Sequence, residues 1–226
     1  MLNLEELNYK DTKLYSLFKW KILSKLDNEN ERKQYQKIFN LAYFTSKLKF
    51  DWYKRDSWEP YFEHLERTAI IILEEFENPN FEKVILALLH DIVEDTNISH
   101  NKLEEFFSEE CLNRIFHISK NDKNLTCDWI VDKVKYFTFD EKKITKQKYF
   151  KRLLKTKDKI VIDVKLADRI DNLRTMYIWK AEKVKKKIKE TRKYILPLAT
   201  KHNKVAERLI LEEISKLEHY FNLNKV

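Results

Sequence analysis

The sequence predicts an all-α protein, built as a bundle of amphipathic helices. Its 226 residues include no glycine and only three prolines, whereas all-β folds rely on glycine in their many tight turns. Hydrophobic residues make up 43% of the chain, which is enough for a sizeable core. Apolar residues also recur with a helical period in nearly every segment, so helices should account for most of the structure.

The first part of the chain predicts a succession of helices. In order, they cover segments 3–25, 30–48, 61–76, a helix from Phe81 through Ile92, and shorter helices at 100–108, 109–119 and 127–137. Pro79 breaks the chain after the third helix, and Asn97–Ser99 has the composition of a turn and a helix cap.

The second part begins with a polar segment, 138–145, that we predict to be a loop. Helices are expected at 146–156 and 158–178, and a last helical stretch at 180–222 is interrupted near Pro197. We expect residues 1–45 to form an N-terminal helical extension of a main domain that covers 46–226. The absence of glycine excludes a glycine-rich nucleotide-binding loop.

The formal charge of +8 raises the question of a nucleic-acid partner. Lysine supplies 36 of the 45 basic residues, and acidic residues are mixed with them along the chain. An arginine-rich cluster would favour binding in a nucleic-acid groove, so this mixed pattern argues against such a partner. We interpret the run Lys183–Lys189 as the solvated face of a helix.

Cysteine usage and the N-terminus bear on the location of the protein. Cys111 and Cys127 are the two cysteines, and they lack metal-binding spacing, which favours a reduced cytoplasmic setting. The first ten residues contain acidic side chains and no long apolar stretch, so no signal peptide is expected. No run approaches the roughly 18 apolar residues of a membrane span, which predicts no membrane partner.

The segment LALLHDIVEDT (86–96) places a histidine next to three carboxylates. On a single helix, four polar side chains would span about 140° of surface opposite the apolar stripe: His90, Asp91, Glu94 and Asp95. Clustered carboxylates repel one another, and a divalent cation would offset that repulsion. The alternative is an exposed acidic face that contains a histidine by chance.

The segment VIDVKLADRIDNLRTM (161–176) aligns Asp168, Asn172 and Thr175 on one helix face. A short acidic side chain on a mostly apolar helix is a candidate metal ligand. The alternative is a surface aspartate that pairs with Arg169 or Lys165.

The segment RDSWEPYFEHLERTA (55–69) carries a third candidate, His64, on a helix that Pro60 can begin. A lone histidine on an amphipathic helix is more often structural than a ligand. Considered together, however, three helices supply His64, His90, Asp91 and Asp168. Such a set of nitrogen and oxygen ligands suits one Mn²⁺, Fe²⁺ or Zn²⁺ and leaves positions for water and substrate. The interior of a helical bundle is a usual place for this kind of site.

The order H…HD…D and its surroundings resemble the HD superfamily, and in particular the hydrolase domain of the RelA/SpoT-type enzymes. The resemblance rests on R-D-S-W-E-P-Y-F-E-H (55–64), L-L-H-D-I-V-E-D-T (88–96) and V-K-L-A-D-R-I-D-N-L-R-T (164–175), and covers roughly residues 46–200. It implies a helical HD domain that binds one Mn²⁺ and hydrolyses the 3′-pyrophosphate of the guanine nucleotide (p)ppGpp, as a small stand-alone hydrolase.

The resemblance also implies roles for individual residues. His64, His90, Asp91 and Asp168 match the metal ligands, and Glu94 and Asp95 match the catalytic acidic pair. Substrate-binding positions are Arg55, which matches the residue that packs on guanine, Asn172 and Thr175 near the ribose and phosphates, and Ser57 in the first motif. As a separate hypothesis about mechanism, Lys165 or Arg169 would bind the substrate and offset charge in the transition state.

Two positions depart from the family pattern. Trp58 replaces a loop glycine and is expected to reshape the loop, and Asp56 stands where lysine is common, which removes a positive charge near a phosphate. The alternatives are therefore an HD phosphohydrolase that acts on another nucleotide or phosphorylated cofactor, a regulatory module that binds a nucleotide without cleaving it, and a nucleic-acid binder. The oligomeric state and the role of residues 1–45 stay open.

Overall fold

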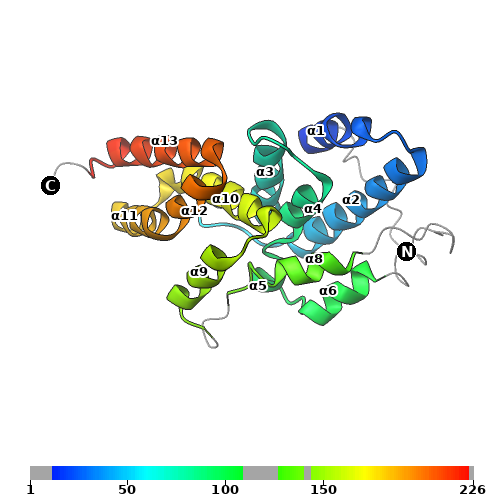
Figure 1. Cartoon of the computed structure of the whole chain (residues 1–226). Helices are drawn as coiled ribbons and strands as arrows, with labels where there is room; N and C mark the ends of the chain where they lie inside the picture. Colours follow the sequence, from blue (N-terminus) through cyan, green and yellow to red (C-terminus); the bar gives the residue numbers. More distant parts are fainter. Residues whose placement is uncertain (1–11, 109–126, 140–143, 224–226) are drawn as a thin grey trace.

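The computed structural model describes residues 12–108, 127–139 and 144–223 of the chain. These residues form helices joined by short connections and contain no β-strand, which confirms the predicted all-α class (Figure 1). The helix predicted at 109–119 lies outside the described residues. No helix in the described part of the chain combines the length and apolar character needed to cross a membrane.

Three helices form the centre of the bundle: α3 (Tyr61–Glu74), α4 (Phe81–Leu89) and α10 (Lys159–Arg174). Each of them packs against the other two (Figure 1). All of α4 except Glu82 is buried, and α10 is buried over most of its length. A helix enclosed in this way has no solvent-facing side, so its polar residues must face the interior or a cavity.

The chain leaves the path of α4 at the histidine and aspartate singled out by the sequence. α4 ends at Leu89, His90 and Asp91 follow, and the short helix α5 (Ile92–Asp95) then begins. The prediction that one helix presents these polar residues opposite an apolar stripe is therefore wrong. The physical reason is that α4 is buried on nearly every side, so the acidic residues of α5 reach the cavity only after α4 has ended.

The N-terminal helices pack against this centre. They are α1 (Lys13–Lys21), the 3₁₀ turn η2 (Leu23–Lys25) and α2 (Glu29–Lys49). α1 contacts α3 and α2 contacts α4, and their buried residues belong to the same hydrophobic core. Phe18 and Phe39 stack with their ring centroids 4.2 Å apart. α2 continues through residue 45, and the domain boundary expected there stays a prediction.

A second group of helices lies beside α4 and α5: α6 (His100–Phe107), α8 (Asp128–Val134) and α9 (Lys146–Lys155). Ser99 caps α6 by accepting the Lys102 backbone N–H at 3.2 Å, as the turn predicted at Asn97–Ser99 indicates. In Figure 1, α9 reaches from this group toward the C-terminal helices.

The C-terminal part follows α10 through η3 (Met176–Ile178), α11 (Ala181–Glu190), the π-helical turn η4 (Thr191–Ile195), α12 (Leu196–His202) and α13 (Lys204–Tyr220). Pro197 lies in the first turn of α12, where proline is tolerated, so the helical path continues through it. The interruption predicted near Pro197 occurs instead at Asn203, whose extended backbone separates α12 from α13.

Candidate active site

Three central helices bring the predicted metal ligands together. His64 lies on α3, His90 directly after α4, and Asp168 on α10. One ligand atom from each of these residues lies within 4.8 Å of the other two. The Asp91 carboxylate joins the group, because its Oδ2 is 3.5 Å from His64 Nε2 and 3.2 Å from His90 Nε2. The four side chains therefore surround one point inside the bundle.

The chemistry of this cluster fits a divalent cation. His90 is fully buried, and within the described part of the chain its Nε2 makes no hydrogen bond, although Asp91 Oδ2 lies 3.2 Å away. Its Nδ1 lies 2.8 Å from the Ala87 carbonyl oxygen, which assigns the proton to Nδ1 and leaves the lone pair of Nε2 facing the cluster. A buried polar atom without a partner costs free energy, and a cation bound at Nε2 would remove that cost.

Glu94 on α5 lies in the wall of a cavity next to the ligand cluster. Its Oε2 accepts the backbone N–H of Phe139 at 2.9 Å, which fixes the carboxylate in place. Burial and the nearby Asp91 carboxylate raise the pKa of Glu94 to about 7. A carboxyl group with this pKa can exchange a proton near neutral pH, which is what a general base requires.

Asp95 and the candidate metal ligand Asp91 both contact the hydroxyl group of Tyr61. Tyr61 Oη contacts Asp91 Oδ2 at 2.8 Å and makes a shorter contact with Asp95 Oδ2. A phenol has one proton, so it donates to only one of these two carboxylates at a time. Burial and the Asp91 charge raise the pKa of Asp95. Tyr61 thus connects α3 to both acidic residues.

A cavity of about 280 Å³ opens beside the cluster. Its lining joins acidic and basic side chains from α3, α5, α9, α10 and α11: Tyr61, His64, Asp91, Glu94, Asp95, Phe139, Lys146, Tyr149, Phe150, Lys165, Asp168, Arg169, Asn172, Lys187 and Glu190. Three of the four cluster residues, together with Glu94 and Asp95, form an acidic end, while His90 lies behind the lining. Lysine and arginine side chains from α9, α10 and α11 form a cationic end.

Glu190 forms ion pairs with three basic side chains of the cationic end. Its carboxylate lies 3.0 Å from Arg169, 3.4 Å from Lys187, and in ion-pair contact with Lys146. Burial works against the charge of Glu190, but Lys187 and Arg169 outweigh it and lower its pKa to about 2. Burial and the neighbouring Arg169 lower the pKa of Lys187 to about 8. This end therefore holds several cations around one carboxylate.

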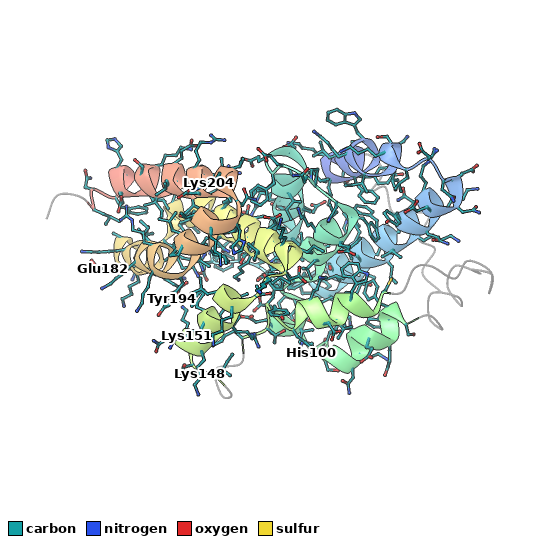
Figure 2. All side chains as sticks on the ribbon, viewed as in Figure 1. His100, Lys148, Lys151, Glu182, Tyr194 and Lys204 are labelled. Atoms are coloured by element: carbon teal, nitrogen blue, oxygen red, sulfur yellow. The ribbon has the colours of Figure 1, made fainter. Side chains whose placement is uncertain are left out.

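Helix α9 supplies the outer wall of the cationic end. Phe150 on α9 stacks on Tyr194 of η4 with the ring centroids 4.5 Å apart, and Figure 2 shows Tyr194 beside α9. Lys148 and Lys151 lie on the outer side of α9 (Figure 2), whereas Lys146 lines the cavity. The aromatic stack thus holds α9 against the C-terminal helices.

The predicted substrate-binding residues fall into two groups. Lys165 and Asn172 line the cavity, and Lys165 Nζ lies 2.7 Å from Asp168 Oδ2. Arg55, Ser57 and Thr175 are not part of its lining. Arg55 instead contacts Asn172 Oδ1 at 2.5 Å and Thr175 Oγ1 at 3.5 Å. Arg55, Asn172 and Thr175 therefore lie together beside the cavity. The packing of Arg55 on a guanine base stays a prediction.

Sequence reasoning missed several residues that line the cavity: Tyr61, Lys146, Tyr149, Lys187 and Glu190. The interpretation of Lys183–Lys189 as a solvated face is wrong for Lys187, which points into the cavity, while its neighbours Lys185 and Lys186 are exposed. One signal in the sequence could have set Lys187 apart from the other lysines. Glu190 follows it by three residues, a spacing that permits an ion pair on a helix.

The two departures from the family pattern lie in the loop before α3. Trp58 has φ 63°, the left-handed conformation that glycine adopts freely and that costs other residues roughly 1–2 kcal/mol. Its N–H still donates to the Arg55 carbonyl at 2.8 Å, which closes the turn. Asp56 forms an exposed ion pair with Lys183 and does not line the cavity.

Comparisons with known proteins agree on one family. A family model described as an HD domain matches residues 42–203. The guanosine-3′,5′-bis(diphosphate) 3′-pyrophosphohydrolase of Aquifex aeolicus is 33% identical over 74% of this chain and 22% of that protein. The bifunctional (p)ppGpp synthase/hydrolase SpoT of Escherichia coli K12 is 29% identical over 70% of this chain and 21% of that protein.

A solved structure shares the fold. It belongs to a metazoan ortholog of SpoT that is described as hydrolysing ppGpp, and it superposes with a TM-score of 0.60 at 21% identity. The match covers 79% of this chain and 94% of the other. By contrast, the chain spans about a fifth of the length of the curated relatives it matches. The cavity and ligand cluster lie within the residues matched by the family model.

Proposed function

Since this chain belongs to the HD domain family, we propose that it is a metal-dependent phosphohydrolase that removes the 3′-pyrophosphate of (p)ppGpp, yielding GDP or GTP and pyrophosphate. Relatives at 33% and 29% identity are named for this activity. The observation that carries the proposal is a single cavity that joins the buried ligand cluster, Glu94 and a cationic end. Such a cavity suits a substrate with several phosphate charges.

His64, His90, Asp91 and Asp168 would hold the cation, which we take to be Mn²⁺, with Fe²⁺ and Zn²⁺ as alternatives. A divalent ion bound there lowers the pKa of a water molecule and offsets charge on the phosphate. Lys165, which contacts Asp168 at 2.7 Å, keeps that carboxylate oriented toward the cluster.

Glu94 is the proposed general base. Its pKa of about 7 allows it to accept a proton from the attacking water at neutral pH. The water oxygen bonds to phosphorus while the bond from phosphorus to the ribose oxygen breaks. The proton that Glu94 accepts would then pass to the ribose oxygen, which leaves as the 3′-hydroxyl. Asp95, held by Tyr61, would orient the water beside Glu94.

The cationic end would bind the phosphate oxygens. Lys165, Arg169 and Lys187 line the cavity and can offset charge that develops in the transition state. Asn172, also in the lining, is our proposed contact to the ribose. We keep Arg55, Ser57 and Thr175 as proposed substrate contacts on the strength of the motif alone.

A substrate panel tests this function. The purified chain with Mn²⁺ would be offered ppGpp, pppGpp, a 3′-phosphorylated cofactor and a nucleoside monophosphate, with separate assays for pyrophosphate and orthophosphate. We expect pyrophosphate release from ppGpp and pppGpp, and loss of that release when a chelator removes the metal. Orthophosphate release from the cofactor or the monophosphate, with ppGpp left intact, would assign the same site to another substrate.

A further inference from the structure

Asp171 is a buried carboxylate that no sequence motif singled out. It lies on α10, three residues after Asp168, and is 1% exposed. Its Oδ2 is 2.6 Å from His64 Nδ1, and its Oδ1 accepts Arg67 Nε–H at 2.5 Å. Arg55 donates to the same Oδ2 at 3.0 Å. One carboxylate therefore contacts a predicted metal ligand and two guanidinium groups.

The contact with His64 decides which nitrogen of the ring faces the cluster. A carboxylate accepts hydrogen bonds, so Nδ1 carries a proton, and Nε2 is the nitrogen that remains to bind a cation. His64 Nε2 is the atom that lies 3.4 Å from Asp168 Oδ1 and 3.5 Å from Asp91 Oδ2. The proton at Nδ1 thus directs the ligand nitrogen toward the metal position.

The two histidines of the cluster differ in this respect. His90 Nδ1 faces a neutral backbone carbonyl, that of Ala87, at 2.8 Å. His64 Nδ1 faces a charged carboxylate at 2.6 Å. A carboxylate partner raises the basicity of an imidazole ligand, and removal of such a partner typically weakens metal binding by 10- to 100-fold.

Guanidinium groups keep Asp171 charged and fixed in the interior. Arginine stays protonated at all relevant pH values, so Arg55 and Arg67 offset the Asp171 charge. Glu59 completes the group, because its Oε1 accepts Arg67 Nη2–H at 2.7 Å and lies 3.4 Å from Arg55 Nη1. Two carboxylates and two guanidinium groups thus balance one another, and the ion pairs hold Asp171 beside His64.

We propose that Asp171 is a positioning residue that fixes the tautomer and orientation of His64 and strengthens it as a metal ligand, with Arg55 and Arg67 holding Asp171 in place. This inference rests on the metal site of the proposed function and does not depend on the substrate. It also gives Arg55 a role within the protein, through its contact with Asp171.

Asp171→Asn tests the proposal, because the variant keeps the shape of the side chain and loses its charge. The matched control is Asp163→Asn, which removes another buried carboxylate of α10 that pairs with Lys83 at 2.8 Å, away from the cluster. Calorimetry with Mn²⁺ alone should give a Kd about 10- to 100-fold weaker for Asp171→Asn. The control should bind Mn²⁺ as the parent chain does, even if both variants unfold at a lower temperature. Equal Kd values for Asp171→Asn and the parent would overturn the proposal.

Nitrogen-15 NMR of the unsubstituted chain loaded with Zn²⁺ provides a second test that requires no variant. We expect His64 to show a protonated Nδ1 and a metal-bound Nε2. A metal bond at Nδ1 would overturn the proposal, whether or not Asp171→Asn folds. Neither measurement uses a nucleotide, so a chain that binds Mn²⁺ in the expected way and leaves ppGpp intact contradicts only the hydrolase. A chain that binds no divalent cation contradicts both.

Discussion

The acidic and cationic ends of the cavity are built in different ways. The acidic end takes its proposed metal ligands from α3, from the residues directly after α4 and from α10, and His64, His90 and Asp168 are at most 4% exposed. The cationic end relies on longer side chains of varied exposure, from 3% for Arg169 to 59% for Lys146. Packing of the central helices therefore sets the positions of the ligands, whereas ion pairs around Glu190 set the positions of the cations.

This difference separates two tasks of a hydrolase site. A metal ligand must be placed closely, and side chains locked in a packed core meet that requirement. Phosphate groups differ in number and position, and lysines on flexible stems can follow them. Changes at the acidic end should therefore abolish or slow the reaction, while changes at the cationic end should weaken substrate binding.

The largest effect is expected from His90→Ala, which removes a fully buried nitrogen that we propose as a metal ligand. The variant should lose both stoichiometric Mn²⁺ binding and hydrolysis of (p)ppGpp, because no other side chain replaces Nε2 at that position. Metal analysis and a pyrophosphate assay measure the two losses. His219→Ala, an exposed histidine on α13, is the control and should retain both. A His90→Ala variant that still binds Mn²⁺ stoichiometrically would remove His90 from the ligand set.

Glu94→Gln should separate metal binding from turnover at the same end. The amide cannot accept a proton from water, so kcat should fall on the order of 10²-fold or more while the Mn²⁺ content stays unchanged. Glu104→Gln on α6 is a matched control at an exposed glutamate and should behave as the parent does. Turnover of Glu94→Gln at the parental rate would show that another group takes the proton.

The two ends also differ in how far the sequence could predict them. The predicted ligands lie in short, dense motifs. The structure brings His64, His90, Asp91 and Asp168 together, and their role as metal ligands stays a prediction. The break between His90 and α5 was not predicted, because periodicity along the chain does not show that α4 is enclosed by its neighbours. Asp171 was missed for a related reason, since its partners Arg55 and Arg67 lie more than 100 residues away.

The cationic end was harder to predict because lysine is abundant throughout the chain. Lys146 and Lys187 resemble the solvated lysines beside them, and only the packing of α9 and α11 around the cavity distinguishes them. Glu190 was equally hard to predict, because its ion pairs are with Arg169 and Lys146 from two other helices. Residues whose role arises from tertiary contact leave little local signal.

Substitution of Lys187 should have an intermediate effect on KM, and Lys187 should also make the KM of the parent chain depend on pH. Lys187→Ala should raise KM for ppGpp about tenfold, the effect of losing one charge-assisted hydrogen bond. Burial and Arg169 lower the Lys187 pKa to about 8, while Glu190 and Asp168 oppose that shift and Lys165 adds to it. As pH rises through about 8, Lys187 loses its proton and its attraction for phosphate, so the KM of the parent chain should increase.

Lys187→Arg is the variant that checks this assignment, since arginine keeps its charge above pH 8. Its KM should stay nearly constant from about pH 7 to about pH 9.5, while the KM of the parent chain rises. Steady-state kinetics across that range measures the difference. The same rise in both proteins would assign the pH dependence to another group.

The smallest effect is expected at Asp56, which tests whether charge matters outside the cavity. Asp56 pairs with Lys183 on the surface, where both side chains are more than half exposed. Solvent and salt screen an exposed charge, so Asp56→Asn should change KM for ppGpp by less than about twofold. A larger fall in KM would mean that the phosphates extend beyond the cavity toward α11, and the cationic end would then include the loop that carries Trp58. An unchanged KM, beside the tenfold rise in Lys187→Ala, would confine phosphate recognition to the cations that line the cavity.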